Sequence, residues 1–225
     1  MAINLTKGQK INLEKDNGSK LTKFCVGCNW GAIVTEGKKL FGILGSGKNV
    51  QNVDLDLSCI MVDASGQMCD YIYSPLYRRE FLQSYNLSQG KLDSNDGALH
   101  HSGDDLEGDT DGNDNLDNEI ITVDLTHVSP NVQQIFFFLN NCGQEDFSQI
   151  PYASIRMYEG TPSRVDSVFA QYNVASEPQF KGMLAMIMGK VYKRNNEWKF
   201  GAIGDAFPDA NIGATIKRIL DSYAR

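Results

Sequence analysis

The chain has 225 residues, and its 41% hydrophobic and 22% charged residues are typical of a globular protein that buries a sizeable core. Its net charge is −7, and it contains neither a run of 18 apolar residues nor an N-terminal apolar signal-peptide core, which argues against a membrane-spanning helix and against secretion. We therefore expect a single cytoplasmic domain over residues 1–225.

Most of the chain is predicted to form short strands, because apolar residues alternate with polar ones or form short runs between Gly, Asn and Asp. In chain order these segments are KINLEK, KLTKFCVGCNW, VDLDLSCIMVD, CDYIYS, EIITVDL, VQQIFFFLNN, YASIRMYE, SVFAQYNV and GMLAMIMGKVYKRNNEWKFGAIG. Within the last segment, KRNNEW is typical of a hairpin turn. The pattern predicts an all-β fold, a β-sandwich of two antiparallel sheets over about residues 1–205, with a few peripheral helices.

Two segments have helical patterns. SPLYRREFLQSY would begin at Ser74, with Pro75 in the first turn. The C-terminal DANIGATIKRILDSY predicts a helix over about residues 209–223, with one apolar face made of Ile212, Ile216, Ile219 and Tyr223. The polar stretch 84–103, at the end of the first of these segments, predicts a long loop.

One stretch is unusually acidic. Eight of the sixteen residues from Asp104 to Glu119 are carboxylates, and no Lys or Arg occurs from Leu92 to Ile155. Such a face is a poor match for nucleic acid and a good one for a cation. Two carboxylates about 5 Å apart repel each other by roughly 3 kcal/mol at an effective dielectric constant of about 20, so a folded loop of this kind gains from a bound ion.

The spacing within this stretch favours calcium over a merely solvated loop. Asp109, Asp111, Asp114 and Asp117 alternate with Gly and Asn residues, which permit the tight turns that wrap a small ion. Carboxylate and amide oxygens are the ligands that Ca²⁺ prefers, whereas zinc is disfavoured because the loop has no His or Cys. Mg²⁺ is the alternative, but so many oxygens suit the higher coordination number of Ca²⁺. An EF-hand is rejected, since EIITVDL, the next segment, is a predicted strand rather than a helix.

A second acidic pair lies upstream in VDLDLS. In a strand, Asp54 and Asp56 point to the same face, where they are either solvated or bound to an ion. GILGSGK, residues 42–48, is close to a phosphate-binding loop, but Asn49 replaces the Ser or Thr that would hold Mg²⁺ and a strand follows. A glycine-rich surface turn is therefore the favoured interpretation.

The cysteines and histidines give no catalytic pattern. The five cysteines have no framework spacing, and Cys25 and Cys28 form a lone C-x-x-C that is interpreted as two ordinary thiols. His100 and His101 border the acidic stretch and are interpreted as exposed loop residues. With His127 as the only other histidine, a Ser-His-Asp or Cys-His arrangement has no support.

Several of these stretches together resemble the TerD family of tellurite-resistance and stress-response proteins. MAINLTKGQKINLEK is similar to its opening strands, LTKFCVGCNW to VGLGWD, and DLDLS to FDLDAS. HSGDDLEGDTDGNDNLDNEIITVDL resembles the family hallmark HTGDNLTGEGDGDDEVITVDL. DFSQIPYASIRMYE and GKVYKRNNEWKFGAIGDAF resemble NFGQVSNAYIRLVN and GELYRNGGEWKFRAVGQGY, so the resemblance covers nearly the whole chain.

The resemblance implies a non-enzymatic β-sandwich that binds two calcium ions. The implied ligands are Asp54 and Asp56 from the first element, then Asp104, Asp105, Asp109, Asp111, Asp114 and Glu119, with the carbonyls of Leu106 and Gly112. Gly31 replaces the family's Asp after Trp30, so one ligand is either lost or replaced by Asn29. NLD at 115–117 is an apparent insertion that leaves Asp117 and Glu119 competing for one ligand role.

Three functions follow as hypotheses. The first is a cytoplasmic calcium-binding stress-response module that presents a surface to other proteins of a stress-response complex or to a membrane-associated complex, without nucleic acid. The second is a metal-dependent phosphate hydrolase, which needs an open coordination position and a basic phosphate clamp. The third is nucleotide-dependent signalling through residues 42–48.

Overall fold

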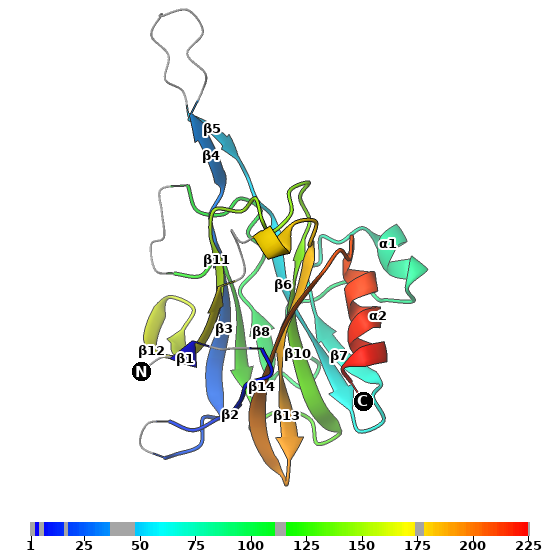
Figure 1. The fold of residues 1–225 in the computed structure, drawn as a ribbon. Helices are drawn as coiled ribbons and strands as arrows, with labels where there is room; N and C mark the ends of the chain where they lie inside the picture. The colour runs from blue at the N-terminus through cyan, green and yellow to red at the C-terminus, as the bar shows by residue number, and fades with distance from the viewer. Residues whose placement is uncertain are drawn as a thin grey trace, which may run out of the picture.

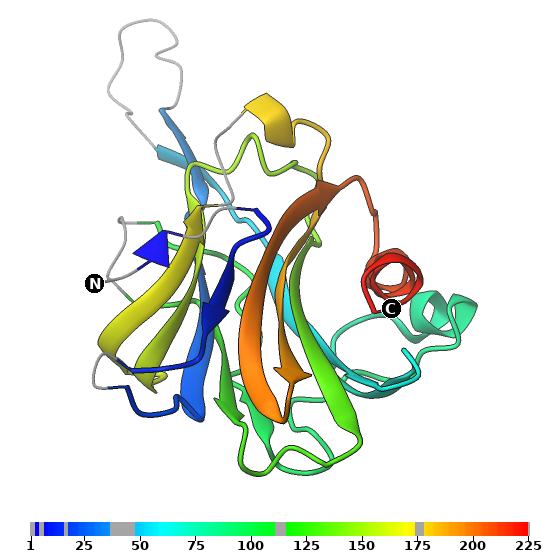
Figure 2. The same ribbon diagram turned by 60° about the horizontal axis from the view of Figure 1, so that its bottom comes forward.

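The computed structural model describes residues 3–4, 7–15, 18–36, 48–110, 116–173 and 178–224. They form a β-sandwich of two six-stranded sheets packed face to face (Figures 1 and 2). The first sheet has the order β1 (Ile3–Asn4), β12 (Arg164–Asn173), β11 (Ala153–Thr161), β3 (Lys23–Trp30), β9 (Glu119–Asp124) and β8 (Leu99–His101). The second has the order β2 (Lys10–Asn12), β14 (Glu197–Phe207), β13 (Ala185–Arg194), β10 (Val132–Asn141), β6 (Leu55–Asp63) and β7 (Met68–Ile72).

Neighbouring strands of both sheets pair antiparallel, except that the short β1 pairs parallel with β12. This confirms the predicted all-β sandwich. The turn predicted in KRNNEW is confirmed as well, because Asn195 and Asn196, with φ of 54° and 61°, join β13 to β14. Asn tolerates this left-handed region better than most residues, and two such residues in succession suit a two-residue hairpin turn.

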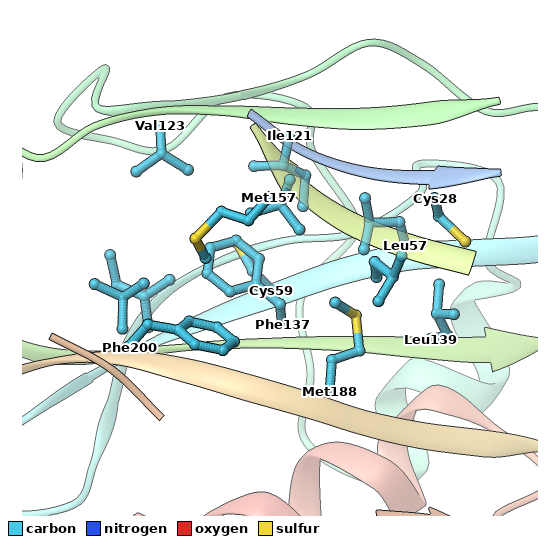
Figure 3. Packing of buried hydrophobic residues seen from close by; sticks show 14 of the residues in the cluster. Cys28, Leu57, Cys59, Ile121, Val123, Phe137, Leu139, Met157, Met188 and Phe200 are labelled. Carbon is cyan, nitrogen blue, oxygen red and sulfur yellow. The ribbon is translucent and has the colours of Figure 1, made fainter. Parts of the chain in front are cut away.

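The main core fills the space between the sheets. Leu57 from β6 and Phe137 from β10 face Ile121 from β9 and Met157 from β11 (Figure 3). Cys28 on β3 belongs to this core, whereas Cys25 on the same strand packs with a smaller cluster. The C-x-x-C thus places its thiols in separate apolar surroundings, and all five cysteines are free.

The central strands β6 and β10 are buried on both faces. Phe137 points into the sandwich, while Phe136 and Phe138 point to the opposite face and pack with Ile216 of helix α2 (Ile212–Ser222). Adjacent residues of a strand face opposite ways, so a strand covered on both sides needs a continuous apolar sequence. This explains the run IFFFL in β10.

Helix α2 confirms the predicted C-terminal helix, and the Asn211 side chain caps it by accepting a hydrogen bond from the Ala214 amide at 3.0 Å. The prediction of a helix beginning at Ser74 was wrong, because α1 spans only Arg79–Ser84. The Ser74 hydroxyl instead accepts from the Leu76 amide at 3.0 Å and donates to Asp104 at 2.8 Å, which holds this segment in a turn. A short 3₁₀ helix, η1, covers Pro178–Phe180. No helix in the described ranges has the length and apolarity needed to cross a bilayer.

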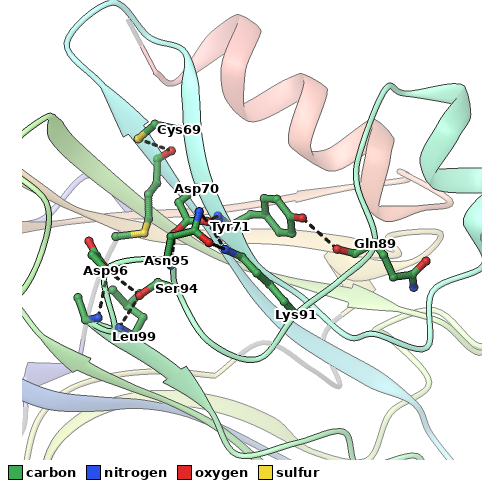
Figure 4. A network of polar contacts seen from close by, with 11 residues as sticks. Cys69, Asp70, Tyr71, Gln89, Lys91, Ser94, Asn95, Asp96 and Leu99 are labelled. Carbon is green, nitrogen blue, oxygen red and sulfur yellow. Dashed lines mark hydrogen bonds and ion pairs between the residues drawn. The ribbon is translucent and has the colours of Figure 1, made fainter.

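The stretch 84–103, predicted as one long loop, ends in strand β8, so that prediction was wrong for its last residues. The loop before β8 is fixed to β7 by polar contacts around Asp70 (Figure 4). The Asp70 carboxylate accepts from Lys91 Nζ at 2.5 Å and from the Asn95 amide at 2.6 Å. The polar sequence of the loop offers little apolar packing, so these bonds hold the loop in place.

A two-stranded ribbon, β4 (Ile33–Glu36) with β5 (Lys48–Gln51), projects beyond the sandwich (Figure 1). Of the near-phosphate-loop motif, residues 42–47 lie outside the described residues, and Lys48 begins β5. The segments after the motif are strands, as predicted, rather than the helix that a phosphate-binding loop requires.

Candidate metal centre

Three of the predicted ligands form one compact cluster. The carboxylates of Asp56, Asp104 and Glu119 offer oxygen atoms that all lie within 4.8 Å of one another. Asp56 is the second residue of β6 and Glu119 the first residue of β9, so the cluster joins the ends of strands from opposite sheets. Asp104 reaches it from the loop that follows β8.

Backbone amides hold the Glu119 side chain across the gap between the sheets. The Leu57 amide donates to Glu119 Oε2 at 2.7 Å, and the Asp105 amide donates to Oε1 at 3.1 Å. Both bonds orient a fully buried carboxylate next to Asp56, which is itself buried. The strand ends therefore fix the positions of these acids without the help of a basic side chain.

The other cluster oxygens have few donors. Asp56 accepts from the Cys142 thiol at 2.8 Å and from the Tyr77 hydroxyl, and one oxygen of Asp104 accepts from Ser74. The second oxygen of Asp104 and one oxygen of Asp54 are buried and accept no hydrogen bond from the described residues. A buried acceptor without a partner is costly, and a hard cation would satisfy both oxygens.

Burial and mutual repulsion favour the uncharged forms of these acids. Burial, together with the charge of Glu119, raises the pKa of Asp56 to about 8. Burial, together with the charge of Asp104, raises the pKa of Asp54 to about 6. Burial also raises the pKa of Glu119 well above its usual range. A divalent cation would take the place of the protons that the cluster otherwise holds near neutral pH.

His101 is buried beside the cluster, so the interpretation of it as an exposed loop residue was wrong; His100 is exposed, as predicted. His101 Nδ1 accepts from the Gly103 amide at 3.0 Å, so Nε2 carries the proton and donates to the Leu57 carbonyl at 3.0 Å. Burial lowers the pKa of the imidazole, so His101 is neutral at pH 7 and does not cancel the acidic charge.

A groove of about 630 Å³ leads from the surface to the cluster. Asp54, Asp56 and Asp104 line it on one side, and the first turn of α2 lines it on another. Asp54 and Asp56 therefore share one face of their segment, as the sequence predicts. Leu106, whose carbonyl was an implied ligand, lies on the groove with an exposed side chain.

Asp105 and Asp109 form a second polar group that amides already occupy. Asn118 Nδ2 donates to Asp105 at 3.0 Å and to Asp109 at 3.3 Å. Asn29 Nδ2 donates to Asp109 at 3.1 Å, and the Tyr152 hydroxyl donates to the same carboxylate at 3.1 Å. Asn29 thus contacts the predicted ligand Asp109 as a donor rather than acting as a ligand itself.

Asp117 does not join the cluster. Its buried carboxylate accepts from Arg156 Nε at 3.0 and 3.1 Å, and a side chain on Gly27 would collide with it. The guanidinium neutralises Asp117, which leaves Glu119 as the member of the competing pair that reaches Asp56. The remaining predicted ligands, Asp111, Gly112 and Asp114, lie outside the described residues.

Sequence reasoning missed several polar residues around the groove, among them Ser74, Asn140 and Cys142. Asn140 is the register partner of Asp56 in the β10–β6 pair, and Cys142 directly follows β10. For Asn140 and Cys142, the only sign in the sequence was the polar stretch NNC at the end of an apolar strand. This stretch points to the groove only once β10 is known to pair with β6.

Comparisons with known proteins identify the family and support the fold. A family model described as the TerD domain matches residues 1–218. Stress response protein SCP2 of Bacillus subtilis is 30% identical, covering 98% of this chain and all of its own length. Tellurium resistance protein TerZ of Serratia marcescens is 28% identical over 99% of this chain and all of its own length. A crystal structure of a homologue of telluride resistance protein TerD from Streptomyces coelicolor has the same fold, with a TM-score of 0.54 and 13% identity over 83% of this chain and 90% of that chain.

Proposed function

The chain belongs to the TerD domain family, and we propose that it is a cytoplasmic stress-response protein of the tellurite-resistance type whose Asp56, Asp104 and Glu119 bind a calcium ion. The names of its relatives, SCP2 and TerZ, support the role in stress and tellurium resistance. The observation that carries the proposal of calcium binding is the carboxylate cluster, in which two buried oxygens, one each on Asp54 and Asp104, have no donor among the described residues.

The donor set suits calcium. Charged oxygens within 4.8 Å of one another repel by about 3 kcal/mol per pair at an effective dielectric constant of about 20. The attraction of each oxygen to a bound divalent ion would outweigh this repulsion. Asp54 and water from the groove complete the higher coordination number that Ca²⁺ takes. The protein contributes fixed strand ends, so little ordering is required when the ion binds.

A second ion, which the family resemblance implies, would bind at Asp105 and Asp109. There it competes with the amides of Asn29 and Asn118, so its affinity is lower than that of the first ion. Asn29→Asp removes one competing donor and supplies a carboxylate. This variant should bind the second ion more tightly without changing the first.

A binding module fits the groove better than a phosphate hydrolase does. Arg78 is the single basic residue among the described residues that line the groove, and phosphoryl chemistry at a metal needs a stronger positive clamp. Turnover of generic phosphoesters in the presence of Mn²⁺ or Mg²⁺ would favour the enzyme instead. We therefore propose a non-enzymatic role, in which the ion-bound end of the sandwich presents a surface to a partner protein.

Calorimetric titration with Ca²⁺ tests the metal site. Wild-type protein should bind with measurable heat, while Asp56→Asn and Glu119→Gln should lose the first site. Asp166→Asn, on the exposed face of β12, is the matched control and should bind like wild type. Binding that survives both cluster variants would reject the cluster as the site.

Survival on tellurite tests the stress-response role separately. A strain that lacks the protein should regain resistance when wild type or Asp166→Asn is supplied. Asp56→Asn and Glu119→Gln should restore less resistance at equal protein levels. Full rescue by the cluster variants would separate resistance from the cluster.

A further inference from the structure

The groove beside the cluster combines an acidic floor with an apolar rim. Asp54, Asp56 and Asp104 line the floor. Leu76, Phe81 and Leu106 line the same groove, and they are 66, 56 and 49% exposed. Single exposed apolar residues are ordinary, but three around one cavity mark a binding surface.

Asn140, also on the groove, adds an unpaired acceptor. The Thr215 hydroxyl donates to the Asn211 carbonyl, so it accepts from Asn140 Nδ2 at 2.9 Å. Asn140 is 2% exposed, and its Oδ1 accepts nothing from the described residues. A cation on the floor would satisfy the oxygens of Asp54 and Asp104, whereas Asn140 Oδ1 would still lack a donor, so the groove also suits a ligand that brings an N–H group.

The floor stays negative even when it holds one divalent ion. Asp54, Asp56, Asp104 and Glu119 carry four negative charges when ionised, and a calcium ion together with Arg78, the one basic residue among the described residues that line the groove, cancels three of them. A complementary ligand is therefore cationic at its tip and apolar around it. A lysine side chain within an apolar peptide has this chemistry.

The chain itself contains such a peptide at the end of the β4–β5 ribbon. Residues 37–48, GKKLFGILGSGK, contain Lys38, Lys39 and Lys48, four large apolar residues and no acid. Residues 37–47 lie outside the described residues. The ribbon that carries them pairs Val34 with Val50, and these valines are 39 and 42% exposed. An isolated two-stranded ribbon is marginally stable in water, so this ribbon gains from being covered.

We propose that the segment 37–48 of one copy docks in the groove of a second copy, with its lysines over the acidic floor and its apolar side chains on the rim formed by Leu76, Phe81 and Leu106. In both ribbon views the β4–β5 ribbon projects away from α1 and α2, so a neighbouring molecule's groove is the one that it meets (Figures 1 and 2). Each copy offers one segment and one groove. Such a contact closes into a dimer when two copies exchange segments reciprocally, and it builds larger rings or open chains when they do not.

Sedimentation velocity over a concentration series tests this inference through complementary variants. The segment variant Leu40→Ser/Phe41→Ser has an intact groove, and the groove variant Leu76→Ser/Phe81→Ser has an intact segment. Each should be monomeric alone, whereas wild type should self-associate as its concentration rises. An equimolar mixture of the variants should form a heterodimer and stop there, because only one productive contact is left. Leu116→Ser, which removes an exposed leucine away from the groove, is the matched control and should assemble like wild type.

Three results would each overturn the inference: a monomeric wild type up to its solubility limit, assembly that survives in either variant alone, or a mixture that stays monomeric. A fluorescent peptide of residues 36–48 gives an independent readout. It should bind the segment variant and not the groove variant, and Lys38→Glu/Lys39→Glu in the peptide should weaken binding by about tenfold or more. Both measurements are made in EDTA and in calcium. Docking that persists in EDTA stands even if the calcium site proposed above fails.

Discussion

Two buried carboxylates of the second sheet, Asp70 on β7 and Asp56 on β6, have opposite surroundings. Asp70 receives a lysine and a backbone amide, which compensate its charge (Figure 4). Among the described residues Asp56 accepts from two neutral donors, the Cys142 thiol and the Tyr77 hydroxyl, and it faces another acid, Glu119. Burial alone is thus no sign of an ion site. The sign is burial without a compensating positive charge, and the two regions should respond to calcium and to mutation in different ways.

The largest expected effect is that of calcium on stability. At a free concentration of about a thousand times the Kd, binding should raise the free energy of unfolding by about 4 kcal/mol. Asp56→Asn should lose most of this gain, whereas Asp70→Asn should keep it. Urea denaturation in calcium and in EDTA measures both. Equal gains in the two variants would mean that the ion binds away from Asp56.

Removing the Asp70 carboxylate should be costly with or without calcium. Asp70→Ala leaves Lys91 and the Asn95 amide without their acceptor, and breaking a buried pair of this kind costs about 3 kcal/mol. The same denaturation curves give the free energy of unfolding. If calcium restored the stability of Asp70→Ala, the ion would have to act in the region of Asp70 as well.

The free energy of unfolding should also depend on pH through Asp56. The folded pKa of Asp56 is raised to about 8 from an ordinary value of 3.8, so the folded state keeps a proton that the unfolded chain releases. Its stabilisation is complete below about pH 4 and is lost as the pH rises through about 8, at up to about 1.4 kcal/mol per pH unit.

The measurement compares wild type with Asp56→Asn in EDTA between pH 6.5 and 8. Wild type should lose stability relative to the variant over this range, because asparagine does not titrate. The comparison is made above pH 6.5 because His101, whose pKa is lowered from 6.5, acts in the opposite direction below it. A difference that grows in favour of wild type would contradict the raised pKa.

The smallest effect is expected where a carboxylate is exposed. On α2, Asp221 accepts from Lys217 across one helical turn, and both side chains are more than half exposed. Lys217→Ala should change the free energy of unfolding by less than about 0.5 kcal/mol, because solvent screens such pairs. A larger loss would mean that surface pairs contribute to this fold as buried ones do.

Local sequence patterns predicted the strands and the C-terminal helix, because alternation is a property of neighbouring residues, whereas the family resemblance supplied Asp104 and Glu119 of the cluster. They did not predict what depends on distant pairing. Asp117 meets Arg156 through the β11–β3–β9 arrangement, and Asn140 meets Asp56 only through the register of β10 with β6. Ser74 was misread as a helix start because its hydroxyl binds Asp104, thirty residues away in sequence. His101 was misread because β8 is short and lies within a polar stretch.

Glu119 connects the two sheets of the sandwich at the cluster. It starts in one layer of the sandwich and is held by the Leu57 amide of the other, so an ion shared with Asp56 would clamp the two layers together at this end. The five cysteines are free and provide no covalent tie between the layers. Such a clamp could be released by chelation rather than by reduction, which would let the protein loosen one end in response to metal supply while its thiols stay unchanged.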